Sequence, residues 1–421
     1  MEEVAMLATV PERVVIVGGG IASDACAAEL RQSGYNGSIQ MLCGEPWRPY
    51  ERPPLSKEAL DDKGSIEGRF FLHPESWYDD NAIELRLGVH AAGLDTRQNT
   101  VELTTGEKIG FDRLLLATGG TVRKLRIEGG EAPNVHYLRT KDDALSLASA
   151  LTQGSSIAII GMGVIGAEIA ASARKLGCNV TAIEPETGPM TRALGSQLSN
   201  WLAGVHHKQG VQALYGVSVA RFVMEDGLVR AVECNDGTLV SCDAVCVGIG
   251  IIPETGLASD AGLAVANGIV VDHQNRTSVP SIFSAGDVAE LPAFDGADRV
   301  RYETYQNAAE QGATAARAML GQAADNTGPC TFWTNQYDLN IQSAGKVSDE
   351  FSIVWRGSMG DDGFVAFFLD GERLVGAVAV NRARDMAVAR KLVAAKIDVK
   401  PEDLASEALP LRSLLKALSK N

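Results

Sequence analysis

Residues 155–186 read SSIAIIGMGVIGAEIAASARKLGCNVTAIEPE, and this stretch decides the fold class. A short apolar run ends in a glycine turn, a segment with helical spacing follows, and a second apolar run closes the stretch. The change from a strand period to a helix period and back indicates a βαβ unit. Residues 13–43, which begin RVVIVGGG, repeat the same order. The repeat predicts an α/β protein with two Rossmann-like dinucleotide-binding domains.

The glycine turn at 161–166 has the complete GxGxxG spacing of a dinucleotide site. The glycines of such a turn permit a tight bend and a close approach of the backbone to a pyrophosphate, which the following helix N-terminus attracts. The residues predicted to contact this dinucleotide are Gly161, Gly163, Ile165 and Gly166.

Two charged residues after this turn bear on the choice of coenzyme. Glu184 ends the next predicted strand, where a carboxylate hydrogen-bonds the adenosine ribose diol and repels a 2′-phosphate. The sequence therefore favours NADH over NADPH. Arg192 lies downstream and could contact a ribose phosphate, the diphosphate or neither.

The glycine turn at 18–23 is a less complete fingerprint. Its predicted cofactor contacts are Gly18, Gly20, Ala22 and Ser23, and Ser23 replaces the third glycine. Serine is small enough for close packing of helix on strand. Glu45 lies at the expected distance for a ribose contact. The alternative is a glycine-rich turn of an unrelated α/β protein.

Two dinucleotide sites in one chain suggest FAD together with NADH, because a flavin converts a hydride donor into a source of single electrons. The cofactors then carry the redox chemistry. No metal site is predicted: the six histidines are scattered apart from His206 and His207, and neighbouring residues do not face one metal from a regular element.

Composition narrows the partners and the compartment. The chain has 421 residues, 38 basic and 53 acidic, with a net charge of −15. Such an acidic chain is a poor binder of nucleic acid or of an anionic membrane. Seven cysteines without a CxxC pair indicate a reducing compartment. With an acidic start and no apolar run of membrane-spanning length, the prediction is a cytoplasmic protein.

Changes in composition and in the spacing of apolar residues along the chain predict the order of the domains. Residues 83–118 show short strands, whereas Trp-, Phe- and Val-rich strands begin near residue 328 and helical patterns follow them. We predict a discontinuous FAD domain at 1–117 and 250–327, and an NAD domain at 118–249. A smaller α+β C-terminal interface domain covers 328–421.

Seven stretches carry a resemblance to a known family. They are RPYERPPLSK (48–57), LLLATGG (114–120), GMGVIGAE (161–168), VGIG (247–250), TSVPSIFSAGDV (277–288), ETYQNAAEQG (303–312) and FWTNQYDLNIQSAG (332–345). In this order they resemble the NADH-dependent ferredoxin reductases of bacterial oxygenase systems, within the glutathione-reductase superfamily. The resemblance implies a flavoprotein that passes single electrons from NADH-reduced FAD to a [2Fe–2S] ferredoxin serving an oxygenase or a cytochrome P450. The ferredoxin would be adrenodoxin-like or of the Rieske type, and the reductase a monomer or weak homodimer.

The resemblance also implies catalytic roles. Lys57 would lie by the flavin N5 edge and stabilise negative charge on the reduced ring. Glu168 would approach that lysine and the nicotinamide amide. The alternatives without a catalytic role are that Lys57 is a solvated lysine after a Pro-Pro turn, and that Glu168 is a carboxylate stabilised by a helix N-terminus.

Further cofactor contacts follow from the same resemblance. Asp287 would hold the FAD ribityl chain at the N-terminus of a following helix, and Gly248 would let backbone lie against NADH. The remaining FAD contacts would be Arg52, Ala91, Arg139, Tyr305 and Trp333, the last two flanking the flavin ring. One departure concerns Gly44, which stands where the family has an aspartate, so that Glu45 or water would replace its ribose contact.

Three rival functions remain open. A disulfide reductase needs a redox-active cysteine pair, which residues 48–57 lack, and an NADH oxidase would need Cys43 to be reactive rather than a small buried residue. A redox-sensing protein like apoptosis-inducing factor is the third. For the ferredoxin reductase, the basic stretch 382–400, together with Arg301, is predicted to form one rim of the docking surface for an acidic partner.

Overall fold

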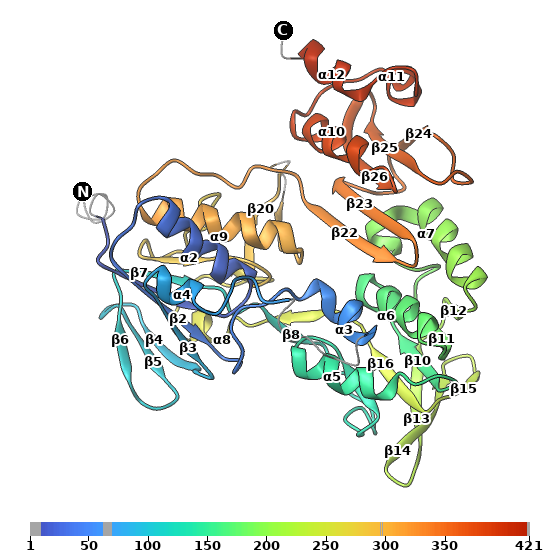
Figure 1. The fold of residues 1–421 in the computed structure, drawn as a ribbon, viewed down its shortest axis with the longest axis horizontal. Coiled ribbons are helices and arrows are strands. Elements are labelled where there is room, and N and C mark those ends of the chain that lie inside the picture. The colour runs from blue at the N-terminus through green and yellow to red at the C-terminus, as the bar shows by residue number, and fades with distance from the viewer. Residues whose placement is uncertain (1–9, 62–69, 295, 297, 419–421) are drawn as a thin grey trace. The chain divides into compact units, whose positions relative to one another are not determined.

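The computed structural model describes residues 10–61, 70–294, 296 and 298–418. They form two compact units (Figure 1). The first contains residues 10–51, 70–121 and 251–328, and the second contains 52–61, 122–250 and 329–418. The boundaries of three domains drawn from the sequence remain a prediction.

A five-stranded parallel sheet organises the first unit. Its order is β19-β7-β1-β2-β3, with bounds β1 Arg13–Val17, β2 Ser38–Cys43, β3 Ile83–Leu87, β7 Arg113–Leu116 and β19 Ile282–Ser284. Strand β1 pairs in parallel register with β2 on one side and β7 on the other. This is the βαβ arrangement that the repeat predicts.

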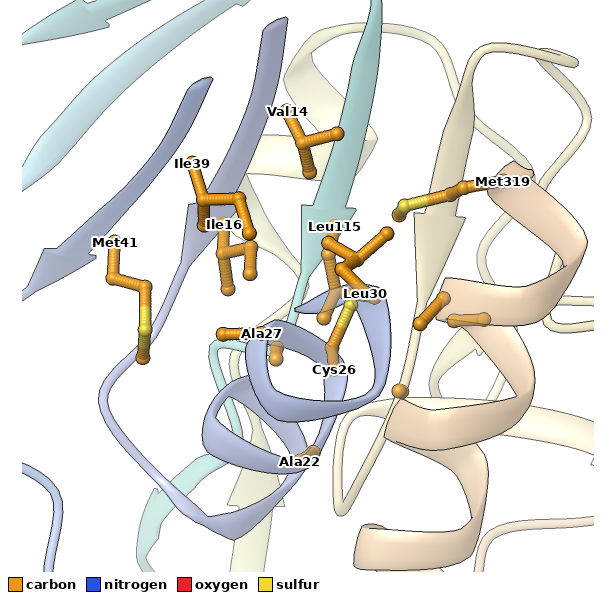
Figure 2. Close-up of a cluster of buried hydrophobic side chains, with 14 of the residues drawn as sticks. Val14, Ile16, Ala22, Cys26, Ala27, Leu30, Ile39, Met41, Leu115 and Met319 are labelled. Carbon is orange, nitrogen blue, oxygen red and sulfur yellow. The ribbon is translucent and has the colours of Figure 1, made fainter. Parts of the chain in front are cut away.

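Helices α2 (Ile21–Gln32) and α9 (Tyr305–Met319) lie side by side over this sheet (Figure 1). Figure 2 shows side chains of the sheet and of both helices converging in one core, among them Ile16, Leu30 and Met319. Burying each large apolar side chain contributes roughly 1.5–3 kcal/mol. This core fixes the start of α2, and with it the first glycine turn.

Smaller elements complete the first unit. An antiparallel sheet is formed by β4 (Ala91–Asp95), β5 (Thr100–Leu103) and β6 (Lys108–Gly110). A mixed sheet contains β18 (Ile269–Val270), β20 (Ala289–Pro292) and β21 (Arg299–Val300), with β18 parallel and β21 antiparallel to β20. Strands β8 (Gly120–Val122) and β17 (Ile251–Pro253) pair, and the short helices are α4 (Trp77–Asp80) and α8 (Gly256–Asp260).

A second parallel sheet organises the second unit. Its order is β12-β11-β10-β16-β9, with bounds β9 Val135–Tyr137, β10 Ser156–Ile160, β11 Asn179–Glu184, β12 Gln212–Tyr215 and β16 Ala244–Val247. Its helices are α5 (Lys141–Ala150), α6 (Val164–Lys175) and α7 (Thr191–Lys208), and α7 is kinked at Gly195. An antiparallel meander comprises β13 (Val219–Glu225), β14 (Leu228–Cys234) and β15 (Leu239–Ser241). The segment 52–61 adds a 3-10 turn, η1 (Pro53–Ser56), and α3 (Glu58–Asp61).

The C-terminal part of this unit is an antiparallel sheet with helices packed against it. The strand order is β22-β23-β26-β25-β24, with bounds β22 Thr331–Gln336, β23 Leu339–Gly345, β24 Ser352–Arg356, β25 Phe364–Asp370 and β26 Arg373–Val380. Helices α10 (Ala383–Ala394), α11 (Pro401–Ala405) and α12 (Leu411–Leu418) follow. The apolar face of α10 packs on β23 and β26. The predicted fold class, two Rossmann-like domains and a smaller α+β domain, is confirmed.

Among the helices of the described residues, none is both long and apolar enough to cross a membrane.

Candidate functional site

The second glycine turn is too tightly packed for side chains. Gly161 has a φ of +91°, and a Cβ added there would lie 2.5 Å from the carbonyl oxygen of Gly248. A Cβ on Gly166 would lie 1.9 Å from the carbonyl oxygen of Gly161. Both distances are far below van der Waals contact, so substitution would displace backbone. The structure thus brings Gly161, Gly166 and Gly248 together, and their contact with a dinucleotide remains a prediction.

The front of the same turn is open. Gly163 is the N-cap of α6, has no side-chain cap and would place a Cβ in open space. The first N–H groups of the helix therefore face outward without a side-chain acceptor. Ile165, in the first turn of α6, is also exposed. Backbone donors and a helix dipole directed at open space fit the diphosphate of a dinucleotide.

Glu184 is held at the end of β11 by two backbone groups. Its Oε2 accepts a hydrogen bond from the Met162 N–H at 2.6 Å, and its Oε1 accepts one from the Glu186 N–H at 2.9 Å. Each carboxylate oxygen keeps a lone pair for a ribose hydroxyl. Arg192 is 89% exposed and forms an ion pair of 3.1 Å with Glu186. Its charge is thereby partly neutralised, which reduces its value for binding a 2′-phosphate.

The first glycine turn repeats this construction at the start of α2. Gly18 has a φ of +132°, and a Cβ there would lie 2.2 Å from the carbonyl oxygen of Ala117. Gly20 is the N-cap of α2 and faces open space. Ala22 and Ser23 are buried behind the turn. This geometry fits a second diphosphate, with Ser23 in a packing position.

The Asp287 loop lies beside this turn. A Cβ on Gly286 would lie 3.0 Å from the Cβ of Ala22, and the Gly286 N–H donates to Gln311 Oε1 at 2.8 Å. Asp287 is followed by a turn and strand β20, so the prediction that it begins a helix is wrong. The next helix is α9, which begins at residue 305. Gly286 of the AGDV stretch thus places the Asp287 loop beside the first glycine turn, and no helix follows the loop directly.

Arg301 does not contribute to a surface charge. Its side chain is 8% exposed, forms an ion pair of 2.6 Å with Glu303, and donates to the carbonyl oxygens of Asn267 and Asp287. The prediction that Arg301 belongs to a docking rim is therefore wrong. The arginine instead ties the Asp287 loop to its neighbours.

The departure at Gly44 has a structural counterpart in His90. A Cβ added to Gly44 would lie 2.8 Å from His90 Cε1 and 3.0 Å from His90 Nδ1. The imidazole therefore occupies the space into which a side chain at 44 would project. The neighbouring Glu45 accepts a hydrogen bond from the Tyr50 hydroxyl at 2.6 Å. His90 is exposed and belongs to the segment between β3 and β4, and no motif of the sequence marks it.

A buried polar cluster around Asp24 was also missed. The Tyr78 hydroxyl donates to Asp24 Oδ1 at 2.6 Å, and His73 Nε2 lies 3.0 Å from Asp24 Oδ2. Burial raises the pKa of Asp24 despite these partners. Tyr305 begins α9, and burial together with nearby Glu51 raises its pKa to about 12. Asp24 could have been noticed as the acidic residue within the first turn of α2.

In the second unit, Lys57 and Glu168 form a buried ion pair. Lys57 follows η1, and its Nζ lies 2.9 Å from Glu168 Oε2 on α6. The Lys57 side chain is 13% exposed and that of Glu168 3% exposed. The Ser56 hydroxyl donates to the same carboxylate oxygen. Lys57 is therefore neither solvated nor alone, and Glu168 does more than cap a helix.

The other predicted FAD contacts are divided between the units. Ala91 begins β4, and the first unit also holds Gly18, Gly20, Ala22, Ser23, Glu45, Asp287 and Tyr305. The second unit holds Arg52, Lys57, Arg139 and Trp333. Within it, Arg52 donates to the carbonyl oxygen of Arg139, which precedes the N-cap of α5. That all of these residues contact one flavin remains a prediction.

All seven cysteines are free thiols. Cys43 is 1% exposed at the end of β2, and burial raises its pKa to about 12. A thiol with so high a pKa is a poor nucleophile at neutral pH. The structure supports the interpretation of Cys43 as a small buried residue.

Comparison with known proteins places these features in a family. Residues 12–312 match the family described as pyridine nucleotide-disulphide oxidoreductase, and residues 331–415 match the family described as reductase C-terminal. Rhodocoxin reductase of Rhodococcus erythropolis is 38% identical over 399 residues, which are 95% of this chain and 93% of that protein.

Two further relatives agree along the chain. The benzene 1,2-dioxygenase system ferredoxin–NAD(+) reductase subunit of Pseudomonas putida is 36% identical over 96% of this chain and 98% of its own. The reductase in the crystal structure of a covalent putidaredoxin reductase–putidaredoxin complex superposes with a TM-score of 0.92 at 33% identity, covering 97% of this chain and 99% of that one. The chain therefore belongs to the pyridine nucleotide-disulphide oxidoreductase family and, within it, to the ferredoxin–NAD(+) reductases, which are oxidoreductases that use FAD and NAD(H).

Proposed function

We propose that this chain transfers electrons from NADH, through bound FAD, to a [2Fe–2S] ferredoxin of an oxygenase or P450 system. One observation carries the choice among related reactions: Cys43 is a buried thiol with a strongly raised pKa, and all the cysteines are free. A disulfide reductase or a cysteine-dependent oxidase needs a reactive thiol. Electrons would therefore leave the protein directly from the flavin.

The second unit would bind NADH. The open N-terminus of α6 would hold the diphosphate and Glu184 the adenosine ribose. Gly248, packed on the glycine turn, would leave room for backbone contact with the coenzyme. Lys57 and Glu168 would fix charge where the hydride is transferred, and holding the reactants in line supplies much of the rate. FAD, when bound, accepts the hydride and releases its electrons singly.

The first unit would hold the FAD diphosphate at the N-terminus of α2 and present Asp287 from the neighbouring loop. At the end of β2, we assign the ribose contact to the His90 imidazole. It fills the space beside Gly44, while Glu45 is engaged by Tyr50. An imidazole can donate or accept a hydrogen bond, so it can replace an aspartate toward a ribose hydroxyl.

The ferredoxin would dock near α10. The basic residues exposed on this helix and just after it are Arg384, Arg390, Lys391, Lys396 and Lys400. Arg382, which is half-buried, is paired with Asp385 and Glu407. A local positive surface on a chain of net charge −15 would steer an acidic partner to this place.

The working state would be a monomer or weak homodimer in the cytoplasm. The free cysteines support a reducing compartment. An adrenodoxin-like and a Rieske-type ferredoxin are both compatible with this surface, and assays with one of each would separate them.

Steady-state oxidation of NADH with different acceptors tests the proposal. We expect rapid turnover with a [2Fe–2S] ferredoxin and slow turnover with oxygen, hydrogen peroxide or oxidised glutathione. Faster turnover with oxygen or peroxide would support an oxidase instead. Slow turnover with every acceptor, after normal reduction by NADH, would favour the redox-sensing function.

A further inference from the structure

A chain of buried hydrogen bonds runs from Glu168 to residues far away in the sequence. Thr334 Oγ1 on β22 lies 2.7 Å from Glu168 Oε1. Gln336 Nε2 lies 3.2 Å from Thr334 Oγ1. His206 Nε2, on α7, lies 2.9 Å from Gln336 Oε1, and the Tyr337 hydroxyl lies 2.8 Å from His206 Nδ1. Four consecutive contacts thus connect α6, β22 and α7 within the second unit.

The central members of this chain are shielded from water. Glu168, His206, Thr334 and Gln336 are each buried to at least 98% of their surface. Buried polar groups that miss a partner are costly, so each group must donate or accept where the geometry allows. The arrangement of protons in the chain is therefore set by the partners themselves.

The direction in which protons are donated along this chain of hydrogen bonds follows from the charged group at its end, Glu168. As the partner of the Lys57 ammonium group, the Glu168 carboxylate can only accept hydrogen bonds. The Thr334 hydroxyl must then donate to Glu168, and its oxygen can only accept from the Gln336 amide. The Gln336 oxygen is left facing His206, which must carry its proton on Nε2. The Tyr337 hydroxyl donates to the remaining ring nitrogen, Nδ1.

Two observations agree with this order. The second N–H of the Gln336 amide points to Met190 Sδ at 3.3 Å, which fixes the amide orientation independently of His206. Burial lowers the pKa of His206 to about 4, so its ring is neutral at pH 7 and can present one donor and one acceptor. Aligned hydrogen bonds of this kind polarise one another.

We propose that His206 is a positioning residue for Glu168, acting through Gln336 and Thr334. The Nε2-protonated imidazole fixes the Gln336 amide, the amide fixes the Thr334 hydroxyl, and the hydroxyl holds Glu168 Oε1 while Lys57 and Ser56 hold Oε2. Both oxygens of the carboxylate are then fixed from opposite sides. This inference rests on the role proposed above for Glu168 in hydride transfer.

The first test is a direct measurement of the tautomer. Nitrogen-15 NMR of the holoenzyme labelled at histidine, with the His206 signals assigned by their loss in His206→Gln, reports which ring nitrogen is protonated. We expect a neutral ring with its proton on Nε2. A proton on Nδ1, or a charged ring at pH 7, would overturn the inference.

The second test compares matched variants in anaerobic stopped-flow reduction of bound FAD by NADH. Thr334→Val should lower the saturating rate about tenfold, the order expected for one lost hydrogen bond to a charged group, with the half-saturating NADH concentration within about twofold. Thr334→Ser should stay near the wild-type rate. His206→Leu should also slow reduction, and His206→Gln, which keeps a donor for Gln336, should restore it.

A purely structural role predicts a different pattern. Wild-type rates in Thr334→Val, or equal losses in His206→Leu and His206→Gln at similar melting temperatures, would overturn the inference. The assay contains no ferredoxin. An enzyme that NADH reduces but that cannot reduce ferredoxin would contradict the proposed function and leave this result standing.

Discussion

Lys57 and Glu168 are 111 positions apart in the sequence, yet Lys57 Nζ and Glu168 Oε2 lie 2.9 Å apart in the second unit. The Pro-Pro turn of η1 brings the lysine to α6, where Ser172 Oγ, one turn beyond Glu168, donates to the Ser56 carbonyl oxygen at 2.8 Å. A segment outside the Rossmann-like sheet is thus tied to the coenzyme helix. The pair combines a cation and an anion where the resemblance implies that both cofactors react.

Removing one partner of this pair should be costly. Lys57→Met leaves the Glu168 carboxylate buried without its cation, and breaking a buried ion pair destabilises a protein by about 3–5 kcal/mol. We expect a lower free energy of unfolding in urea and reduction of FAD by NADH at least about tenfold slower. The double variant Lys57→Met/Glu168→Gln serves as the control. It should recover most of the stability but not the rate, and recovery of both would contradict the catalytic role.

Coenzyme choice should depend on the charge of Glu184. Glu184→Gln keeps one oxygen acceptor, for the backbone N–H of either Met162 or Glu186, and removes the negative charge that repels a 2′-phosphate. We expect the ratio of kcat/KM for NADPH to that for NADH to rise roughly tenfold, the value of about 1.4 kcal/mol of lost repulsion. Adding Glu186→Ala, which releases Arg192, should raise it further. An unchanged ratio in the double variant would show that Glu184 does not select the coenzyme.

FAD affinity should depend on His90. Removing the imidazole in His90→Ala loses the proposed ribose contact, for which a neutral hydrogen bond contributes about 1 kcal/mol. We expect FAD to dissociate about fivefold more readily, as measured by the recovery of free FAD fluorescence on dilution. Glu45→Gln is the matched control and should change the dissociation constant less. The reverse ranking would return the ribose contact to Glu45.

Stability should fall in acid because of His206. Its pKa is lowered to about 4 in the folded protein from 6.5, so between these pH values the unfolded chain binds a proton that the folded chain does not. The stabilisation is complete above pH 6.5 and is lost as the pH falls toward 4, by up to about 3 kcal/mol. His206→Gln removes this titration. Urea unfolding from pH 7 to 4 should therefore show a shallower decline for the variant, and parallel declines would contradict a buried neutral ring.

Ferredoxin association should depend on α10. Reversing the exposed charges in Arg390→Glu/Lys391→Glu should slow ferredoxin reduction several-fold at low salt and weaken its dependence on ionic strength. The control is Arg221→Glu, an exposed arginine on β13. Reduction of FAD by NADH should be unchanged in both. Equal effects of the two reversals on ferredoxin reduction would place the docking surface elsewhere.

The sequence was sufficient to predict both parallel sheets. At each glycine turn the spacing of the apolar residues changes from that of a strand to that of a helix, which marks where the strand ends. The Phe- and Val-rich strands expected after residue 328 include β25, whose residues are buried apart from the last. Strand β23, LNIQSAG, was not recognised because its polar residues carry little of the alternation that marks a strand. The helix expected after Asp287 does not form. The sequence AGDV resembles a helix N-cap, but the turn at Gly286 leads into strand β20.

The sequence could indicate residues of the candidate site only where they belong to short motifs. Gly161, Gly166 and Glu184 could be placed by spacing alone, and Lys57 with Glu168 by resemblance. His206, Gln336 and Thr334 could not, because their contacts join segments far apart in the chain and no local pattern marks them. His90 was missed because its role depends on the missing side chain of Gly44.

An anaerobic titration of the FAD-loaded enzyme with NADH, followed by addition of a [2Fe–2S] ferredoxin, tests the central claim most directly. We predict bleaching of the flavin with long-wavelength charge-transfer absorbance, then rapid return of the oxidised spectrum as the ferredoxin is reduced. A flavin that bleaches but stays reduced in the presence of both adrenodoxin-like and Rieske-type ferredoxins would contradict it.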